Sequence, residues 1–214
     1  MKEGPRGTVT LLRHKQSGSR CVLRRFQGSS AVYEKLLSVR SSHLPQILAV
    51  ASEANQVLVV EEYVAGDTLA DLLETASCSV YQTKSIAMDV CRGLWILHTL
   101  GAVHRDVKPE NILLRGKEAV LVDFNASRVM VPEQRTDTVV LGTTGYAAPE
   151  QYGLSQTDGR ADIYSLGVTM NVMLTGQHPS RKLASGRMGR IIQRCTMVAP
   201  EKRYQTVLDL MEAL

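Results

Sequence analysis

One short polar stretch, residues 104–111 with the sequence HRDVKPEN, carries side chains suited to phosphoryl transfer. In that chemistry an aspartate of the loop accepts the proton of the attacking hydroxyl, and an asparagine at its end holds a magnesium ion. Asp106 and Asn111 have these types and lie far enough apart to reach two sides of one triphosphate. Lys108 adds a cation where negative charge develops on the transferred group. A polar loop before a short apolar strand is the alternative, and ordered partners downstream disfavour it.

Four later stretches supply those partners. Residues 120–125 read VLVDFN, residues 142–150 read GTTGYAAPE, residues 162–167 read DIYSLG and residues 200–204 read PEKRY. Together with the HRDVKPEN loop, they resemble the motifs of protein kinase domains, most nearly those of bacterial serine/threonine kinases. The resemblance covers nearly the whole chain and is most specific between the loop and the DIYSLG stretch.

The resemblance implies an α+β, two-lobed protein-kinase-like fold with a small β-rich N-lobe and a larger α-helical C-lobe. We expect one protein kinase domain over residues 1–214, with the N-lobe at residues 1–62 and the C-lobe at residues 63–214. The N-terminus is expected to be clipped, so that the chain begins inside the glycine-rich loop without the strand that leads into it. Hydrophobic residues make up 44% of the chain, enough for a sizeable core.

Regular patterns predict the elements that position the motifs. Apolar residues recur at three- and four-residue spacing over residues 79–100, which predicts a helix before the catalytic loop. Residues 112–114 and 119–124 predict a hairpin after that loop, and residues 47–51 and 57–63 predict another in the N-lobe.

Composition excludes several other classes of protein. The net charge of +4 is only mildly basic, and no stripe of basic and aromatic residues indicates a nucleic-acid partner. Cys21, Cys78, Cys91 and Cys195 form no C-x-x-C pair, so neither zinc nor a disulfide framework is indicated. No apolar signal core is present, and the longest uncharged run, residues 164–177, is shorter than the about 20 residues that span a bilayer. We expect a cytoplasmic protein with no membrane segment in this chain.

The resemblance assigns roles to the catalytic residues. Asp106 would be the base, Lys108 would stabilise the developing charge, and Asn111 and Asp123 would bind magnesium. Thr143 would hydrogen-bond Asp106 and, with Lys108, would support a preference for serine or threonine hydroxyls.

Other residues of the C-lobe have implied structural or regulatory roles. Asp162 would hold the backbone of the catalytic loop, and Glu150 and Arg203 would form a buried ion pair that ties the activation segment to the lobe. Thr136 and Thr138, in the activation segment, resemble the phosphorylated threonines of bacterial kinases.

The ATP site is implied mainly by the first third of the chain. Glycines allow backbone N–H groups to approach phosphate oxygens closely, and alternation along a strand puts Val22 and Arg24 on one face. The other expected contacts are Gly4, Gly7 and Val9 in the glycine-rich loop, Val22 and Leu113 about the adenine, and the backbone of Glu62 and Val64 in the hinge.

Three residues depart from the kinase pattern. Arg24 stands where the family has a lysine that grips the α- and β-phosphates, and a planar fork does not replace a compact point charge neutrally. Glu34, in a helix expected over residues 31–39, is the candidate partner of Arg24, with an exposed helical carboxylate as the alternative. Asn125 replaces the glycine after Asp-Phe, and asparagine tolerates positive φ. Glu61 brings an unexplained charge to the gatekeeper position beside the adenine.

The sequence therefore predicts a serine/threonine protein kinase that transfers the γ-phosphoryl group of Mg-ATP to a protein hydroxyl. Arg24 is expected to limit turnover, so that Arg24→Lys would raise kcat. The alternative is a pseudokinase, a nucleotide-binding scaffold with weak or no catalysis, which Arg24 and Asn125 favour and the retained Asp106 disfavours. A small-molecule kinase is disfavoured because residues 142–150 resemble a peptide-substrate platform.

Overall fold

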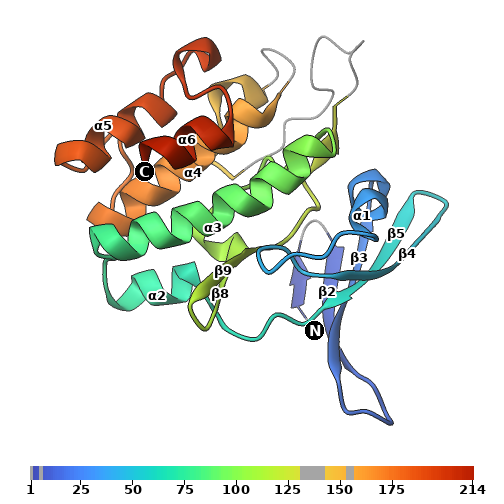
Figure 1. Cartoon of the computed structure of the whole chain (residues 1–214). Coiled ribbons are helices and arrows are strands. Elements are labelled where there is room, and N and C mark those ends of the chain that lie inside the picture. Colours follow the sequence, from blue (N-terminus) through green and yellow to red (C-terminus); the bar gives the residue numbers. More distant parts are fainter. Residues whose placement is uncertain (1, 5–6, 131–142, 153–156) are drawn as a thin grey trace.

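A computed structural model describes residues 2–4, 7–130, 143–152 and 157–214. Figure 1 shows a strand-rich part, formed by the beginning of the chain, beside a larger helical part. The α+β, two-lobed architecture implied by the sequence is thereby confirmed.

The first part is an antiparallel sheet of five strands in the order β1-β2-β3-β5-β4. Its strands are β1 (Lys2–Gly4), β2 (Gly7–Arg13), β3 (Arg20–Gln27), β4 (Ile47–Glu53) and β5 (Gln56–Glu62). The expectation that no strand precedes the glycine turn was wrong, because β1 pairs with β2 from Lys2 to Gly4. The predicted N-lobe hairpin is present as β4 and β5, joined at Ala54 and Asn55.

Helix α1 (Ala31–Leu36) packs beside this sheet and is shorter than the expected helix over residues 31–39. The chain tightens at its end, where Leu37 and Val39 donate backbone hydrogen bonds to carbonyls three residues back rather than four. The buried face of α1 consists of Val32, Tyr33 and Leu36.

The second part is built on two central helices, α3 (Val80–Thr99) and α4 (Gly159–Thr175), which pack on each other. A reciprocal capping box between Ser79 and Gln82 begins α3, and Gly101, with φ 70°, follows its end. Figure 1 shows α3 between the α2 side and the α4, α5 and α6 side of this part. The outer helices are α2 (Leu69–Thr75), α5 (Gly186–Cys195) and α6 (Val207–Ala213).

Two small ladders bracket the catalytic loop. One joins β6 (Asp67–Thr68), β8 (Ile112–Arg115) and β9 (Glu118–Leu121), and the other joins β7 (Ala102–Val103) to β10 (Arg128–Val129). The loop leaves β7 and enters β8 through a short 3₁₀ turn, η1 (Pro109–Asn111). Two further 3₁₀ turns, η2 (Pro149–Tyr152) and η3 (Pro200–Lys202), flank the later helices.

A row of aromatic rings joins the sheet to the catalytic loop. Phe26 of β3 lies 5.6 Å from Tyr33 of α1, centroid to centroid, and Tyr33 lies 5.7 Å from Phe124. Phe124 in turn lies 5.5 Å from the ring of His104. Since Tyr33 and Phe124 are buried, this row fixes α1 and the start of the activation segment against the catalytic loop.

Within the described part of the chain, no helix is long and apolar enough to cross a membrane.

Candidate active site

The catalytic loop is held in place by Asp162 of α4, whose side chain is fully buried. Its two carboxylate oxygens accept the backbone N–H groups of His104, at 2.9 Å, and of Arg105, at 2.7 Å. The ring of His98 contributes a third contact at 2.8 Å. Arg105 has φ 68°, an unfavourable conformation for a residue with a side chain. The contact expected of Asp162 is confirmed, and its charge holds the strained turn.

The four residues assigned to catalysis meet in one cluster. Thr143 Oγ1 donates to Asp106 Oδ1 at 2.7 Å, and Lys108 Nζ lies 2.5 Å from Thr143 Oγ1 and 3.1 Å from Asp106 Oδ2. Asn111 Nδ2 donates to the backbone oxygen of Asp106 at 2.8 Å and to its Oδ2 at 3.2 Å. Residues 37 positions apart in sequence, Asp106 and Thr143, are thus hydrogen-bonded to each other.

These contacts set the charge of Asp106. Burial alone would raise its pKa, but the hydrogen bonds from Thr143 and Lys108 and the positive charge of Lys108 hold that pKa below its usual range. Asp106 is therefore ionised at neutral pH and can accept a hydrogen bond from a substrate hydroxyl.

His104 supports the loop as a neutral side chain. Complete burial lowers its pKa, against the raising effect of nearby carboxylates. Nε2 donates to the carbonyl oxygen of Val122 at 3.2 Å, while Nδ1 accepts the backbone N–H of Asp106 at 3.3 Å. These bonds require the Nε2–H tautomer and tie the catalytic loop to the strand that leads to Asp123.

Asp123 follows β9 and points toward Arg24. Its φ is 67°, so the positive φ that we associated with Asn125 belongs to Asp123 instead. Asp123 Oδ1 lies 3.3 Å from an Arg24 terminal nitrogen and accepts the backbone N–H of Asn125 at 3.3 Å. Asn125 has another use, since its side-chain oxygen accepts the hydroxyl of Tyr33 at 2.8 Å.

The predicted contact between Arg24 and Glu34 is wrong. Arg24 is buried, and its Nε donates instead to Glu61 Oε1 at 2.6 Å. Glu34 is exposed and accepts the hydroxyl of Ser30 at 2.6 Å. Consecutive residues of an α-helix differ by about 100° in direction, so a helix that turns Tyr33 inward turns Glu34 away.

Gly7 lies against β3. Gly4 pairs with Gly7 between β1 and β2, and Gly7 has φ 133°. A Cβ on Gly7 would lie 2.1 Å from the backbone oxygen of Arg25, so no side chain fits there. Val9 faces Arg24 across the β2–β3 ladder. Gly7 and Val9 therefore lie next to the strand that carries the buried arginine, whereas Gly4 lies one strand further out, on β1.

The residues expected about the adenine also lie near the end of the sheet. The β3–β5 register pairs Val22 with Glu61, one residue before the expected hinge. The side chain of Glu62 bonds Arg115 of β8 at 2.9 Å. Val64 packs with Leu113 and two neighbouring valines in a small apolar cluster. Two of the predicted adenine contacts, Val64 and Leu113, are thus brought together.

Sequence reasoning placed Glu61 at the gatekeeper position without finding its partner, and it missed Tyr33 as a member of the site. A signal for Glu61 was present, because an arginine and a glutamate occupy two adjacent strands at positions where the resemblance leads us to expect a lysine and an uncharged residue. No comparable signal marked Tyr33, whose role depends on which face of a six-residue helix is buried.

The end of the activation segment is anchored as expected. Arg203 contacts Glu150 through two bonds, of 2.6 and 2.9 Å, and both side chains are buried. The predicted phosphorylation sites Thr136 and Thr138 lie outside the described residues.

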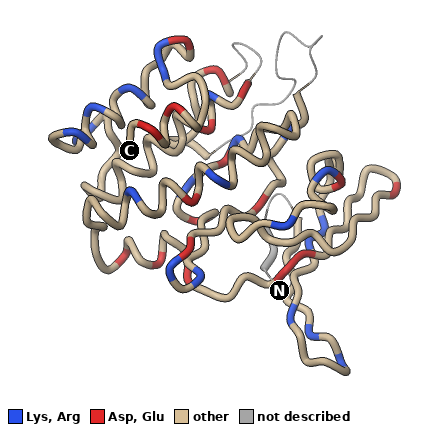
Figure 2. The backbone as a smooth tube through the Cα atoms, in the orientation of Figure 1, with Lys and Arg blue, Asp and Glu red and all other residues tan. Residues whose placement is uncertain are grey.

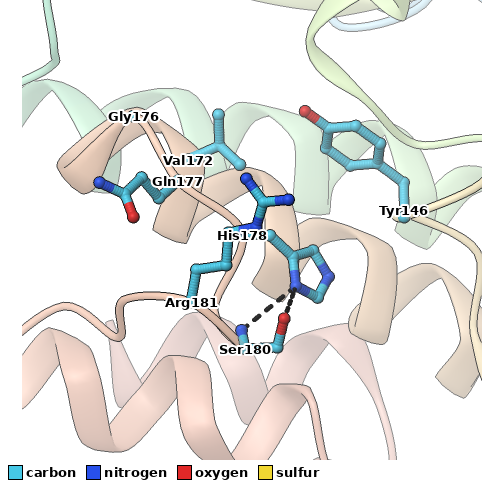
Figure 3. Close-up of a pocket in the computed structure, with 8 residues that line it drawn as sticks. Tyr146, Val172, Gly176, Gln177, His178, Ser180 and Arg181 are labelled. Carbon is cyan, nitrogen blue, oxygen red and sulfur yellow. Dashed lines mark hydrogen bonds between the residues drawn. The ribbon is translucent and has the colours of Figure 1, made fainter.

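A polar pocket of about 480 Å³ adjoins this segment (Figure 3). Tyr146 lies on one side of it, and His178 and Arg181 lie on the other, beyond the end of α4. His178 Nδ1 is bonded to the hydroxyl of Ser180 at 2.7 Å and to its backbone N–H at 3.2 Å. The pocket is open and lies next to the predicted peptide platform.

Basic residues gather on the neighbouring helix α5, as Figure 2 shows. Two of these arginines make contacts that stabilise the fold. The Arg194 guanidinium lies 4.3 Å from the centre of the Tyr204 ring, and Arg187 donates to the backbone oxygen of Ala213 at 2.8 Å. The gathering of charge therefore does not by itself indicate a binding face.

Comparison with known proteins places these features in context. A family model described as "Protein kinase domain" matches residues 3–213. In an alignment that is 218 residues long, the chain is 32% identical to serine/threonine-protein kinase PknA of Nostoc sp. This alignment covers 90% of this chain and 38% of that protein. It is 29% identical over 217 residues to serine/threonine-protein kinase D of Synechocystis sp., covering 88% and 41%. A 125-residue match to PknB of Mycobacterium leprae is 40% identical and covers 56% and 20%. The chain spans less than half the length of each relative.

Proposed function

Because the chain belongs to the protein kinase domain family, we propose that it transfers the γ-phosphoryl group of Mg-ATP to a serine or threonine hydroxyl of a protein. The observation that carries this proposal is the cluster of Asp106, Lys108, Asn111 and Thr143, which brings an ionised carboxylate, a cation and a hydroxyl within hydrogen-bond distance. The names of the bacterial relatives support the serine/threonine class.

Asp106 would act on the incoming hydroxyl. An ionised carboxylate accepts the hydrogen bond of a serine or threonine and orients its oxygen toward the phosphoryl group, taking the proton as transfer proceeds. Thr143 and Lys108 fix the two carboxylate oxygens. Lys108 also places its charge beside the point where the attacking and transferred groups meet, so it would stabilise the negative charge that develops there.

Asp123 and Asn111 fit a magnesium ion that is shared with phosphate. The described residues contain no group of three or more His, Cys, Asp or Glu side chains that could hold a metal by themselves. Magnesium is ordinarily held by one or two carboxylates together with substrate phosphates, and Asp123 supplies such a carboxylate. Asn111 uses its amide nitrogen on Asp106, so its side-chain oxygen is the atom it can offer. The bound ion would neutralise charge on the β- and γ-phosphates.

A protein substrate suits the surface next to the cluster. Tyr146 donates its backbone N–H to the carbonyl oxygen of Thr143 at 3.0 Å, so the turn that carries Thr143 leads directly to the polar pocket. An extended peptide could lie along this turn while its hydroxyl reaches Asp106. We also propose that the lobes divide between residues 62 and 63, where β5 ends and the expected hinge begins.

The test is transfer of radiolabelled phosphate from ATP to a generic protein substrate. Wild-type protein should label the substrate only with magnesium, and Asp106→Asn should abolish labelling. Asp209→Asn makes the same chemical change at an exposed position of α6 and should label at the wild-type rate. Equal labelling by wild type and Asp106→Asn would contradict the proposal.

A pseudokinase remains the second candidate, and one contact favours it. The ion pair between Arg24 and Asp123 occupies the carboxylate that magnesium would need. If the protein binds Mg-ATP with a thermal shift but labels no substrate, the scaffold is the correct function. If it shows no shift at millimolar ATP while folded, neither candidate stands.

A further inference from the structure

We propose that Glu61 of β5 is the positioning residue for Arg24, so that the cation expected to meet the ATP phosphates is oriented within the sheet rather than by a carboxylate of helix α1. This inference rests on the proposed function and concerns how its phosphate site is built. It assigns a role to the charge at the gatekeeper position.

The register of the sheet places the two side chains together. Val22 faces Glu61 and Arg24 faces Val59 across β3 and β5, so Arg24 and Glu61 are diagonal neighbours on one face. The contact between Arg24 Nε and Glu61 Oε1 is 2.6 Å. Both residues are on adjacent, hydrogen-bonded strands, so the separation of their backbones is fixed by the ladder.

A guanidinium is needed for this arrangement. Its Nε edge holds Glu61 while a terminal nitrogen reaches Asp123 at 3.3 Å, on the side of the expected metal and phosphates. Arginine can serve both directions because its donors lie in a rigid planar fork. A lysine ends in a single ammonium nitrogen, so in Arg24→Lys one atom would have to serve Glu61, Asp123 and the phosphates, whereas arginine divides these contacts among its nitrogens. We therefore propose the opposite of our expectation from the sequence: Arg24→Lys should lower turnover.

Both side chains of this ion pair are buried. Arg24 is 8% exposed and Glu61 is 2% exposed. Burial raises the pKa of Glu61, and the charge of Arg24 opposes that rise. Among the described residues, Glu61 Oε2 has no hydrogen-bond partner, so the carboxylate does not link Arg24 to a larger hydrogen-bond network. A buried pair of this kind adds little stability compared with apolar residues of similar size.

Helix α1 contributes no carboxylate to the arrangement. Its buried Tyr33 reaches Asn125, and Glu34 accepts a hydrogen bond from Ser30 at the surface. The orientation of Arg24 therefore does not depend on an ion pair with this helix.

The experiment compares Glu61→Gln with Glu34→Gln, two isosteric removals of one negative charge. Titration calorimetry would measure affinity for Mg-ATP and for adenosine, and the labelling assay would measure kcat and KM. Glu61→Gln should weaken Mg-ATP binding and lower kcat by about 10²-fold, as expected when a group is misplaced by about 1 Å. Adenosine is the reference ligand, because a change beside the adenine affects both ligands and only the ratio of the two affinities reports the phosphate contact. Glu34→Gln should match wild type in every measurement. Arg24→Lys should also weaken Mg-ATP relative to adenosine.

A second variant covers the case in which Glu61→Gln does not fold. Arg24→Met/Glu61→Met removes the whole buried pair and should fold, since apolar replacement of a buried pair is often neutral or stabilising. It should prefer ATP over adenosine less than wild type does. The proposal is overturned if either Glu61 variant keeps the wild-type preference for ATP, if Glu34→Gln loses it, or if Arg24→Lys raises turnover. The affinity ratio can be measured even in a protein that transfers no phosphate, so failure of the proposed function would be seen separately.

Discussion

Replacing the buried Arg203 by lysine should lower the melting temperature, although it keeps the charge. The Arg203 side chain is 0% exposed and uses all five of its N–H groups. Two bonds reach the Glu150 carboxylate, at 2.6 and 2.9 Å. Nε donates to the backbone oxygen of Met197 at 2.7 Å, and the other two bonds reach the backbone oxygens of Arg160 at 3.0 Å and Val198 at 2.9 Å.

The magnitude follows from the number of bonds that lysine can replace. Lysine has three donors, so at least two of the five acceptors lose their partner. With about 1–1.5 kcal/mol for each lost hydrogen bond, Arg203→Lys should cost about 2–3 kcal/mol. Arg203→Met also leaves Glu150 as an unpaired buried charge, and breaking such a pair costs about 3–5 kcal/mol. For a domain of this size, each kcal/mol lowers the melting temperature by about 2–4 °C, so lysine should lower it by about 4–12 °C.

Circular dichroism melts of Arg203→Lys and Arg190→Lys would measure this effect. Arg190 is exposed on α5, so the same substitution there should change stability by less than about 0.5 kcal/mol. Glu150→Gln/Arg203→Met should be more stable than Arg203→Met, because it no longer buries an unpaired charge. Identical melting of Arg203→Lys and Arg190→Lys would refute the reasoning that all five bonds contribute.

Three further predictions concern the active site. Thr143→Val removes a hydrogen bond to the ionised carboxylate of Asp106, so the pKa of Asp106 should rise and the acid limb of the pH profile of kcat/KM should move to higher pH. An acid limb that does not move would contradict the assigned contact. Mg-ATP should raise the melting temperature in a magnesium-dependent way, and Asp123→Asn should remove that dependence in scanning fluorimetry. Mass spectrometry after incubation with Mg-ATP should find phosphate on Thr138 or Thr136, since a phosphothreonine brings three acceptor oxygens for which Arg105 is the expected partner. Unchanged activity of Thr136→Ala/Thr138→Ala would exclude this regulation.

The lowered pKa of Asp106 also has a consequence for stability. The ionised carboxylate is favoured in the folded state, so its contribution is present above the pKa of an unfolded aspartate and is lost as pH falls through the lower folded value. Thr143→Val should therefore reduce the loss of stability upon acidification.

The catalytic part of the site could be predicted from sequence because its residues are set by short spacings. Asp106 and Asn111 lie five residues apart in one loop, and the structure closes that loop with a hydrogen bond between them. The helix expected over residues 79–100 is observed as α3, with polar caps that the sequence carries locally. Asp162 bonds the loop from a distant helix, and there the resemblance rather than the spacing supplied the prediction.

The partner of Arg24 could not be predicted in the same way. A change of one position along α1 rotates a side chain by about 100°, and sequence fixes the ends of a short helix poorly. Glu34 was therefore assigned to a face that Tyr33 occupies. Strand pairing gave the correct partner, because the register of β3 and β5 brings Glu61 to Arg24. That register depends on the whole ladder and cannot be read from either strand alone.

The three departures from the kinase pattern, Arg24, Glu61 and Asn125, are better explained as one adjustment than as three losses. Arg24 contacts Glu61 through Nε and Asp123 through a terminal nitrogen, whereas a lysine would have a single nitrogen for both. Asn125 has the side chain that accepts the Tyr33 hydroxyl, which a glycine could not do. Tyr33 in turn fills the inward position of α1 that a carboxylate would otherwise need. Since a buried ion pair stabilises little compared with apolar residues, stability does not account for Arg24 and Glu61, whereas the proposed role of aiming a cation at phosphate would. These contacts support the proposed phosphate site, while the ion pair between Arg24 and Asp123 is the one contact that would favour a scaffold.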